Sequence, residues 1–321
     1  MGNVATPNFW TGRKVLVTGA SGFIGSNLVP LLKRTGCDLV APPHGDYDLT
    51  EQAQVRRMLG KHKPETVFHL AARVGGALAN EKMPAEFGYE NLVMGTTVLH
   101  ESWRAGVRKY ITLIGACSYP ESAPSPIKET QLFDGIPYAG SAPYALAKAM
   151  NVMLAESYRR QHGFNAIVLV PGNIYGPFDN FDLDNSHVIA ALIRKFIEAK
   201  AANLPEVVAW GSGRPTRDFA YIADVCEAVV IAAEKYDGRD IINLASGHAV
   251  TIREIVETVA ELTGYAGRVV WDASKPDGQM HKCLDTTRME TILGYRCRTS
   301  LRDGIKRTIE WYLSSHPGVR P

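Results

Sequence analysis

The amino-acid sequence predicts an α/β fold, and three observations carry this prediction. Short β-branched apolar runs alternate with helix-length segments from residue 14 to about residue 176. The first run leads at once into a glycine-rich turn and then into an amphipathic stretch. The alternation weakens after Gly176, where the chain becomes polar and irregular. Together these features predict a Rossmann-type doubly wound parallel sheet with a smaller C-terminal α/β lobe.

The elements of the first half follow from local apolar patterns in chain order. KVLVT at 14–18 reads as a buried strand, and the segment 26–34 after the glycines reads as an amphipathic helix. Later apolar runs of four to six residues have strand composition, and the longer periodic segments between them have helical spacing. The further strands are predicted at 38–41, 66–70, 110–114 and 165–170, and the further helices at 51–62, 91–105 and 142–161.

The second half has fewer strong patterns. Short strands are predicted at 207–210 and 269–271, and helices at 222–235 and 252–262. The apolar run at 241–244 is predicted to return to the main sheet. We therefore expect an NAD(P)-binding domain formed by 10–177 plus about 222–248, and a substrate-binding lobe formed by about 178–221 plus 249–321.

Composition narrows the class of protein. The chain has 321 residues, and 45% hydrophobic residues argue against disorder. Lys plus Arg number 35 and Asp plus Glu 33, and this balance gives no reason to expect a nucleic-acid partner. No apolar run approaches the roughly 20 residues of a membrane-spanning helix. Five scattered cysteines, never in C-x-x-C spacing, predict a cytoplasmic protein without disulfides or a metal site: Cys37, Cys117, Cys226, Cys283 and Cys297.

The glycine turn predicts a nucleotide site. Gly19, Gly22 and Gly25 lie between the first strand and the first helix, where side chains would block a pyrophosphate and the helix N-terminus would attract it. The second strand ends in Val-Ala-Pro-Pro-His, which offers neither an acid for a ribose hydroxyl nor an arginine for a 2′-phosphate. Asp48 comes later. The missing acid favours NADP(H), and NAD(H) stays open.

Tyr144 and Lys148 lie four residues apart on the predicted helix 142–161, so both side chains share one face. A nearby ammonium lowers the pKa of a phenol, which suits proton exchange with a carbonyl or carbinol oxygen. The same pair could be an ordinary surface pair in isolation. Beside the glycine turn it predicts a catalytic tyrosine.

At this point the chain resembles the extended short-chain dehydrogenase/reductases. The markers are TGASGFIGS at 18–26, HLAA at 69–72, Asn91, the Tyr144/Lys148 pair and PGNIYGP at 171–177. Within that family it is most similar to the GDP-L-fucose synthase branch. The matching stretches are AARVGG at 71–76, CSYP at 117–120, DNFDLDNSHVI at 179–189, WGSGRPTRDF at 210–219 and WDASKPDG at 271–278.

The resemblance implies a nucleotide-sugar epimerase/reductase. Such an enzyme epimerises GDP-4-keto-6-deoxymannose at C3 and C5 and then reduces C4 with NADPH. Cys117 and His187 would be the proton-transfer pair, Tyr144 would donate to O4, and Lys148 would hold the nicotinamide ribose. A homodimer through the segments 91–105 and 142–161 is also implied.

The same resemblance assigns the binding residues. The coenzyme-binding residues would be Gly19, Ser21, Gly22, Phe23, Ile24, Gly25, Asp48, Leu49, Leu70, Ala71, Ala72, Asn91, Tyr144, Lys148, Pro171, Asn173, Ile174 and His187. The substrate-binding residues would be Asn173, Val188, Trp210, Arg217, Lys275 and Asp277. No metal is implied.

One departure from the family pattern concerns the reductive step. The family places a serine beside the catalytic tyrosine where this chain has Gly115, and losing one such donor typically costs about 2–4 kcal/mol. Ser118 or another group would have to substitute. Three alternatives therefore stay open. The protein could be an epimerase-only enzyme or 4-epimerase, an enzyme that acts on a related keto-sugar such as a heptose, or a non-catalytic NADP-binding regulatory protein.

Overall fold

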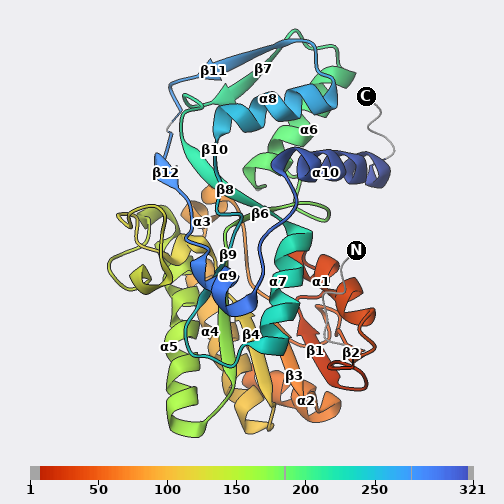
Figure 1. The fold of residues 1–321 in the computed structure, drawn as a ribbon, viewed down its shortest axis with the longest axis vertical. Helices are drawn as coiled ribbons and strands as arrows, with labels where there is room; N and C mark the ends of the chain where they lie inside the picture. The colour runs from red at the N-terminus through yellow and green to blue at the C-terminus, as the bar shows by residue number, and fades with distance from the viewer. Residues whose placement is uncertain (1–7, 184–185, 276, 317–321) are drawn as a thin grey trace.

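The computed structural model describes residues 8–183, 186–275 and 277–316. Its centre is a six-stranded sheet in the order β2-β1-β3-β4-β5-β9, in which every neighbouring pair is parallel (Figure 1). This confirms the predicted Rossmann-type sheet. The strands are β1 Lys14–Thr18, β2 Asp38–Val40, β3 Thr66–His69, β4 Lys109–Leu113, β5 Ala166–Pro171 and β9 Ile242–Leu244.

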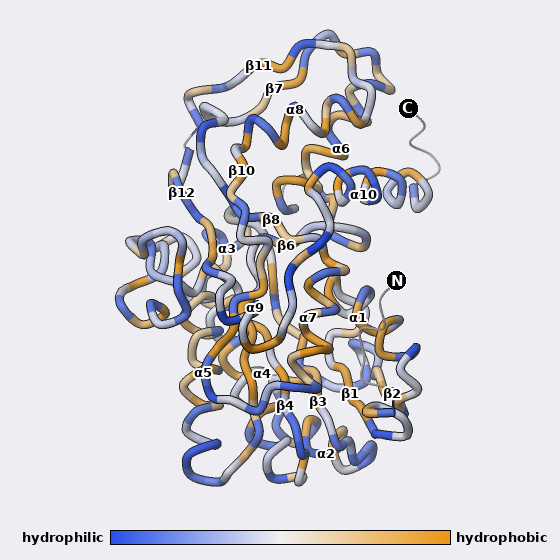
Figure 2. The backbone as a smooth tube through the Cα atoms, in the orientation of Figure 1, coloured by the Kyte–Doolittle hydropathy of each residue, from blue (hydrophilic) through white to orange (hydrophobic). Residues whose placement is uncertain are grey.

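Helices cover both faces of this sheet because its strands are apolar on both faces. In β1, Val15 and Val17 join the same core cluster as Leu28 of α1. Leu16, which points the other way, joins the cluster that holds Val55 of α2. Figure 2 shows the resulting hydrophobic interior of strands and helices. One face carries α1 Phe23–Lys33 and α7 Ile222–Lys235, and the other carries α2 Gln52–His62, α4 Pro84–Arg104 and α5 Ala142–His162.

The strand order reverses beside β1, which positions a ligand site. The chain passes from β1 to β2 on one side and then to β3 on the other, so the carboxyl ends of β1 and β3 lie side by side. In parallel sheets ligands bind at such a reversal, beyond the carboxyl ends of the strands. The glycine turn and the loop after His69 therefore meet at one edge.

A second group of elements packs above that edge (Figure 1). A sheet in the order β10-β8-β12, with β6 also paired to β8, lies beside the two-stranded sheet β11-β7. Helices α6 and α10 both pack on α8. The elements are β6 Asn173–Tyr175, β7 Glu206–Trp210, β8 Thr216–Tyr221, β10 Ala249–Thr251, β11 Arg268–Asp272, β12 His281–Lys282, α6 Val188–Ala201, α8 Ile252–Thr263 and α10 Leu301–Ser315.

The two groups are joined by crossings of the chain. The predicted return strand is confirmed as β9, which pairs in parallel with β5. Helix α9 (Thr287–Leu293) packs against α7 and β9, and β6 leads from β5 into the second sheet. The domain boundaries proposed from the sequence stay a prediction. Between these elements lie the short helix α3 (Ala77–Lys82) and the 3₁₀ turns Ala116–Ser118, Glu129–Gln131 and Ala139–Ser141.

Candidate active site

The glycine turn after β1 is shaped by close backbone approaches at Gly19 and Gly25. Gly19 has a φ of +69°, and a Cβ there would lie 2.6 Å from the backbone nitrogen of Ala71. A Cβ on Gly25 would lie 2.2 Å from the carbonyl oxygen of Gly19. Gly22 occupies the N-cap position of α1, and no side chain accepts from the first-turn N–H groups. These N–H groups are therefore available to a phosphate. The turn therefore fits the pyrophosphate of a dinucleotide.

We expect Gly25→Ala to destabilise the chain by about 3 kcal/mol and to abolish coenzyme binding, because its Cβ would overlap backbone atoms. Thermal unfolding and NADPH fluorescence titration measure the two effects. Gly60→Ala is the matched control, since Gly60 lies in α2 with nothing within 4 Å of an added Cβ. The control should be neutral or stabilising by about 1 kcal/mol. Equal behaviour of the two variants would contradict this account of the turn.

The loop after β3 forms the facing wall of the coenzyme site. The imidazole of His69 is fully buried and bonded to the hydroxyl of Thr18 at 2.8 Å, and burial lowers its pKa to about 3. His69 is therefore a neutral structural residue. Asn91 of α4 accepts from the backbone N–H of Arg73 at 3.1 Å and donates to its carbonyl at 2.9 Å. It thereby fixes the loop that contains Leu70, Ala71 and Ala72.

Other predicted coenzyme residues lie around the same edge. Asp48 is exposed, and its carboxylate accepts from the backbone and hydroxyl of Thr50 at 2.9 and 2.6 Å. Asn173, on β6, donates to the carbonyl of Asp218 at 3.1 Å. The remaining residues are Ser21, Phe23 and Ile24 in the turn and first helix, Leu49 before α2, Pro171 at the end of β5 and Ile174 on β6. Their roles stay predictions.

Tyr144, Lys148 and Cys117 lie close enough to influence one another. Cys117 is in the 3₁₀ turn after β4, and the other two are on α5. Burial raises the pKa of Tyr144, and the charge of Cys117 raises it further. Burial lowers the pKa of Lys148 to about 8, against an opposing effect of Cys117. This differs from the predicted lowering of the phenol pKa, because the buried ammonium does not offset desolvation.

The departure at Gly115 leaves a space between two of these groups. A Cβ at this position would lie 3.0 Å from Sγ of Cys117 and 4.0 Å from the ring of Tyr144. A serine here would therefore stand beside both the sulfur and the phenol. The hydroxyl of Ser118 instead donates to the carbonyl of Ala145 at 3.1 Å. Ser118 stays a predicted substitute donor, and it would have to give up this hydrogen bond to act on the substrate.

We expect Gly115→Ser to accelerate reduction, by up to about 10²-fold if a second donor is limiting. The backbone at Gly115 is extended (φ −85°), so only the contact with Cys117 opposes a side chain. Gly115→Ala adds the same Cβ without the hydroxyl and is the control. NADPH consumption at 340 nm measures both. A serine variant no faster than the alanine variant would show that the site already has its donor.

Sequence reasoning missed Lys282, which the structure places beside Cys117. Its charge, followed by that of Lys148, lowers the pKa of Cys117 against burial, which raises it overall. Lys282 also stands in register with Arg217 across the parallel pair β12 and β8. Burial lowers the pKa of both cations. Two neighbouring, partly buried cations could hold a diphosphate.

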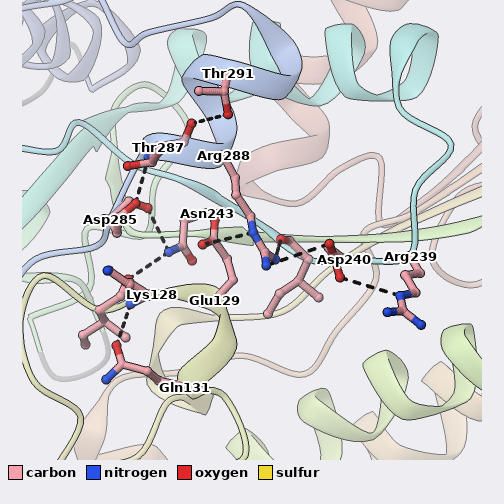
Figure 3. A network of polar contacts seen from close by, with 12 residues as sticks. Lys128, Glu129, Gln131, Arg239, Asp240, Asn243, Asp285, Thr287, Arg288 and Thr291 are labelled. Carbon is pink, nitrogen blue, oxygen red and sulfur yellow. Dashed lines mark hydrogen bonds and ion pairs between the residues drawn. The ribbon is translucent and has the colours of Figure 1, made fainter.

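A buried polar network around Asn243 connects the segment that follows Cys117 with the segment that follows Lys282; Figure 3 shows Asn243 beside Glu129 and Asp285. Asn243 of β9 accepts from the hydroxyl of Tyr119 at 2.6 Å and donates to the carbonyls of Ile127 and Asp285, each at 3.0 Å. Its backbone N–H donates to Glu129 at 3.0 Å. Tyr119 follows Cys117 by two residues, and Asp285 follows Lys282 by three. One fully buried amide therefore fixes both segments.

His187 is held by a different partner. It caps α6, its side chain is 57% exposed, and its Nδ1 lies 2.9 Å from a carboxylate oxygen of Asp179. Asp179 raises the pKa of the imidazole. Val188 follows in the first turn of α6 and is partly exposed. Asp184 and Asn185, in the same predicted stretch, lie outside the described residues.

The remaining predicted substrate residues gather at the end of β7. Trp210 is 63% exposed, and the ammonium of Lys275 lies 5.4 Å from the centre of its ring. Asp277 accepts from the backbone and hydroxyl of Ser212, both at 2.7 Å. Arg217 donates to the carbonyl of Gln279 at 2.6 Å. Pro276, within the predicted KPDG stretch, lies outside the described residues.

The described residues show neither a metal-binding cluster nor a membrane-spanning helix. They contain no group of three His, Cys, Asp or Glu side chains that could hold a metal ion. None of the helices in the described ranges is long and apolar enough to cross a membrane.

The chain is similar to known proteins in both sequence and structure. A sequence model of the "NAD dependent epimerase/dehydratase family" matches residues 15–245. The chain is 41% identical to GDP-L-fucose synthase 1 of Arabidopsis thaliana over 94% of both chains. It is 37% identical to the GDP-L-fucose synthase of Escherichia coli, over 96% of this chain and 99% of that one. A solved GDP-mannoheptose C4 reductase from Campylobacter jejuni with NADP bound superposes with a TM-score of 0.86 at 32% identity, over 94% and 98%.

Proposed function

Because the chain belongs to the NAD dependent epimerase/dehydratase family, we propose that it catalyses the GDP-L-fucose synthase reaction. GDP-4-keto-6-deoxymannose is epimerised at C3 and C5 and then reduced at C4 with NADPH. The observation that carries this proposal is the cluster of Cys117, Tyr144, Lys148 and Lys282, joined to Arg217. Similarity of about 40% to GDP-L-fucose synthases over nearly the whole chain supports the substrate.

The nucleotide-sugar diphosphate is bound by Arg217 and Lys282. Their charges are adjacent on paired strands, and each is disfavoured by burial. An anion between them removes this cost. Trp210 and Lys275 bind the nucleoside from the end of β7, where the ring is exposed. Because Lys282 also acts on Cys117, the diphosphate site leads directly to the thiol.

Epimerisation needs a base on one face of the sugar and an acid on the other, and Cys117 and His187 fill these roles. The C3 and C5 protons of a 4-keto sugar are acidic, so a thiol and an imidazole suffice. The pair must hold one proton between them. Burial favours the thiol on Cys117, while Lys282 and Lys148 favour the thiolate. Asp179 favours the imidazolium on His187.

Reduction uses Tyr144 as a neutral donor. When bound at the glycine turn, the dinucleotide would supply the hydride for C4. The raised pKa of Tyr144 keeps its phenol protonated at neutral pH, so it can donate that proton to O4. Lys148, on the same helix face, would hold the nicotinamide ribose. The coenzyme is NADP(H), as in the superposed reductase with NADP bound.

The pH dependence of proton exchange should be bell-shaped. At low pH both groups are protonated and no base remains; at high pH both are deprotonated and no acid remains. Asp179 raises the pKa of His187 above 6.5, which places the acid limb above that pH. Burial raises the pKa of Cys117 above 9.0, which places the alkaline limb higher still. Deuterium uptake measured across about pH 5–10 checks the profile, and a profile flat over that range would contradict the assignment.

One incubation tests the function. The protein is mixed with GDP-4-keto-6-deoxymannose and NADPH in D₂O, and absorbance at 340 nm is followed with mass spectrometry of the product. We expect deuterium at C3 and C5, NADPH consumption and a GDP-6-deoxy sugar inverted at both centres. If neither deuterium uptake nor NADPH oxidation occurs, the proposal is overturned, and a binding protein or another keto sugar is favoured.

Gly115 favours a second candidate, an epimerase without efficient reduction. A hydroxyl beside Tyr144 is absent at this position, and Ser118 donates elsewhere. Deuterium uptake at C3 and C5 without loss of NADPH absorbance would select this candidate.

We further propose that the enzyme is a cytoplasmic homodimer. The helices α4 and α5 pack together and leave large apolar side chains exposed, which supports pairing with a second copy. All five cysteines are free, which suits a reducing compartment. The exposed side chains are Tyr89, Leu92, Leu146, Met150 and Met153.

A further inference from the structure

Asp179 is a buried carboxylate with an unusual set of contacts. Its side chain is 2% exposed, and one oxygen, Oδ1, lies 2.9 Å from Nδ1 of His187. The same oxygen accepts from the backbone N–H of Asn180 at 2.8 Å. The other oxygen, Oδ2, is buried and has no hydrogen-bond partner within the described ranges. Within the described ranges, the imidazole of His187 is thus the one side chain that forms a hydrogen bond with the carboxylate of Asp179.

The backbone around Asp179 is built to hold it in place. Phe178 adopts a φ of +68°, a left-handed conformation that a bulky residue keeps only when its surroundings enforce it. Its ring lies 4.9 Å from that of Trp311, and Asp179 N–H donates to the carbonyl of Gly176 at 3.3 Å. Asn27 of α1 donates to the carbonyl of Pro177 at 2.9 Å. The turn is therefore attached to the helix that follows the glycine turn.

A purely structural reason for Asp179 is not evident in its contacts. The N-cap position of α6 is His187, and its side chain makes no capping hydrogen bond, so Asp179 does not cap this helix. Asp179 forms no ion pair with Lys or Arg in the described segments. Burying a carboxylate whose one side-chain partner is an exposed imidazole costs stability, and a role in positioning or charging that imidazole would account for keeping it.

The chemical effect on His187 is specific. A carboxylate at Nδ1 fixes the proton on that nitrogen and leaves Nε2 toward solvent, where a substrate would lie. The negative charge also favours the imidazolium. In the described part of the chain, Asp179 is the charged group that raises the pKa of His187. In the Ser-His-Asp catalytic triad, an aspartate orients the catalytic histidine through the same contact at Nδ1.

We propose that Asp179 is the positioning residue of His187: it holds Nδ1 as the donor, leaves Nε2 free for proton transfer with the sugar, and stabilises the protonated ring. This inference deepens the proposed function and rests on it. It adds to the reaction a residue that need not touch substrate or coenzyme.

The test uses the full chain with ¹⁵N-labelled histidine. Nitrogen shifts of His187, assigned with His187→Gln, report its tautomer and its pKa without any substrate. We expect the Nδ1–H tautomer and a pKa above 6.5 in the parent protein. Asp179→Asn keeps an acceptor but removes the charge, so the tautomer should persist and the pKa should fall by about one unit or more. Asp179→Leu should also lose the tautomer.

Asp224→Asn is the matched control, because Asp224 is similarly buried but accepts from the backbone of Arg298 and Thr299. It should leave the His187 titration unchanged. Should Asp179→Leu fail to fold, the isosteric Asp179→Asn variant carries the test alone. An unchanged His187 pKa in Asp179→Asn would overturn the proposal whatever the substrate is.

Deuterium uptake links the titration to the reaction. In Asp179→Asn we expect at least a ten-fold slower uptake at neutral pH, with an acid limb moved to lower pH and unchanged NADPH affinity. An altered titration with unaltered uptake would overturn the link to catalysis. Absence of uptake in the parent protein would instead count against the proposed function and leave the histidine titration as a separate result.

Discussion

Cys117→Ser should abolish deuterium uptake at C3 and C5 while leaving NADPH binding intact. A serine hydroxyl is far less acidic than a thiol, so the charges of Lys282 and Lys148 cannot convert it into a base. The glycine turn is untouched, so coenzyme affinity should not change. The expected loss is about 10³-fold or more in the exchange rate, measured by mass spectrometry in D₂O.

Cys37→Ser is the control for this variant. Cys37 lies just before β2, and its thiol donates to the carbonyl of Leu32 at 3.4 Å, away from the catalytic cluster. It should exchange at the parent rate. Uptake retained in Cys117→Ser would show that another residue is the base, and the assignment of the pair would then be wrong.

Tyr144→Phe should lose reduction and keep epimerisation. The ring of Tyr144 packs edge-on against Phe87 with centroids 6.3 Å apart, and phenylalanine preserves that packing. Only the proton donated to O4 is lost, which typically costs about 10²–10⁴-fold in rate. NADPH consumption should fall by that factor, while deuterium uptake, which depends on Cys117 and His187, should continue.

Tyr138→Phe controls for the loss of a phenol elsewhere, because Tyr138 is 52% exposed and lies before α5. Its reduction rate should match the parent. If Tyr144→Phe consumed NADPH at an undiminished rate, proton donation by Tyr144 would be refuted. Loss of both activities would point to disturbed substrate binding instead.

The main sheet could be predicted from sequence because its elements carry their own signals. The predicted ranges 14–18 and 222–235 coincide with β1 and α7. Both are dominated by buried apolar residues, which for α7 lie in one core cluster and for β1 lie in two, one on each face of the sheet. The start of α4 was predicted seven residues late, because Pro84 opens that helix ahead of its apolar periodicity.

Elements of the second group were largely missed, for two different reasons. The strands β10 and β12 are three and two residues long, and both form by pairing with β8. Such strands depend on tertiary contacts and leave no local pattern. Helix α6 is different, since Ile189, Ile193 and Phe196 repeat at helical spacing within it. This helix could therefore be predicted from the sequence, unlike the two strands.

The residues of the candidate site also differ in how far the sequence predicts their proximity. Tyr144 and Lys148 share one helix, so their proximity follows from spacing alone. The cation beside Cys117 lies 165 positions further along the chain, on a strand too short to predict. Asn243, a buried residue whose partners come from distant segments, joins Tyr119 to Asp285, which follows that cation by three residues. Asp179 was part of a recognised motif, but its contact with His187 required the turn at Phe178.

The central claim is that a thiol and an imidazole exchange protons with the same sugar ring beside the coenzyme. A crystal structure with NADP and GDP-mannose tests it most directly, because mannose occupies the sugar site without reacting. We expect Sγ of Cys117 and Nε2 of His187 on opposite faces of the hexose, each within about 4 Å of C3 or C5, with the phenol of Tyr144 at O4. A hexose bound with either group on the wrong face or out of reach would contradict the account.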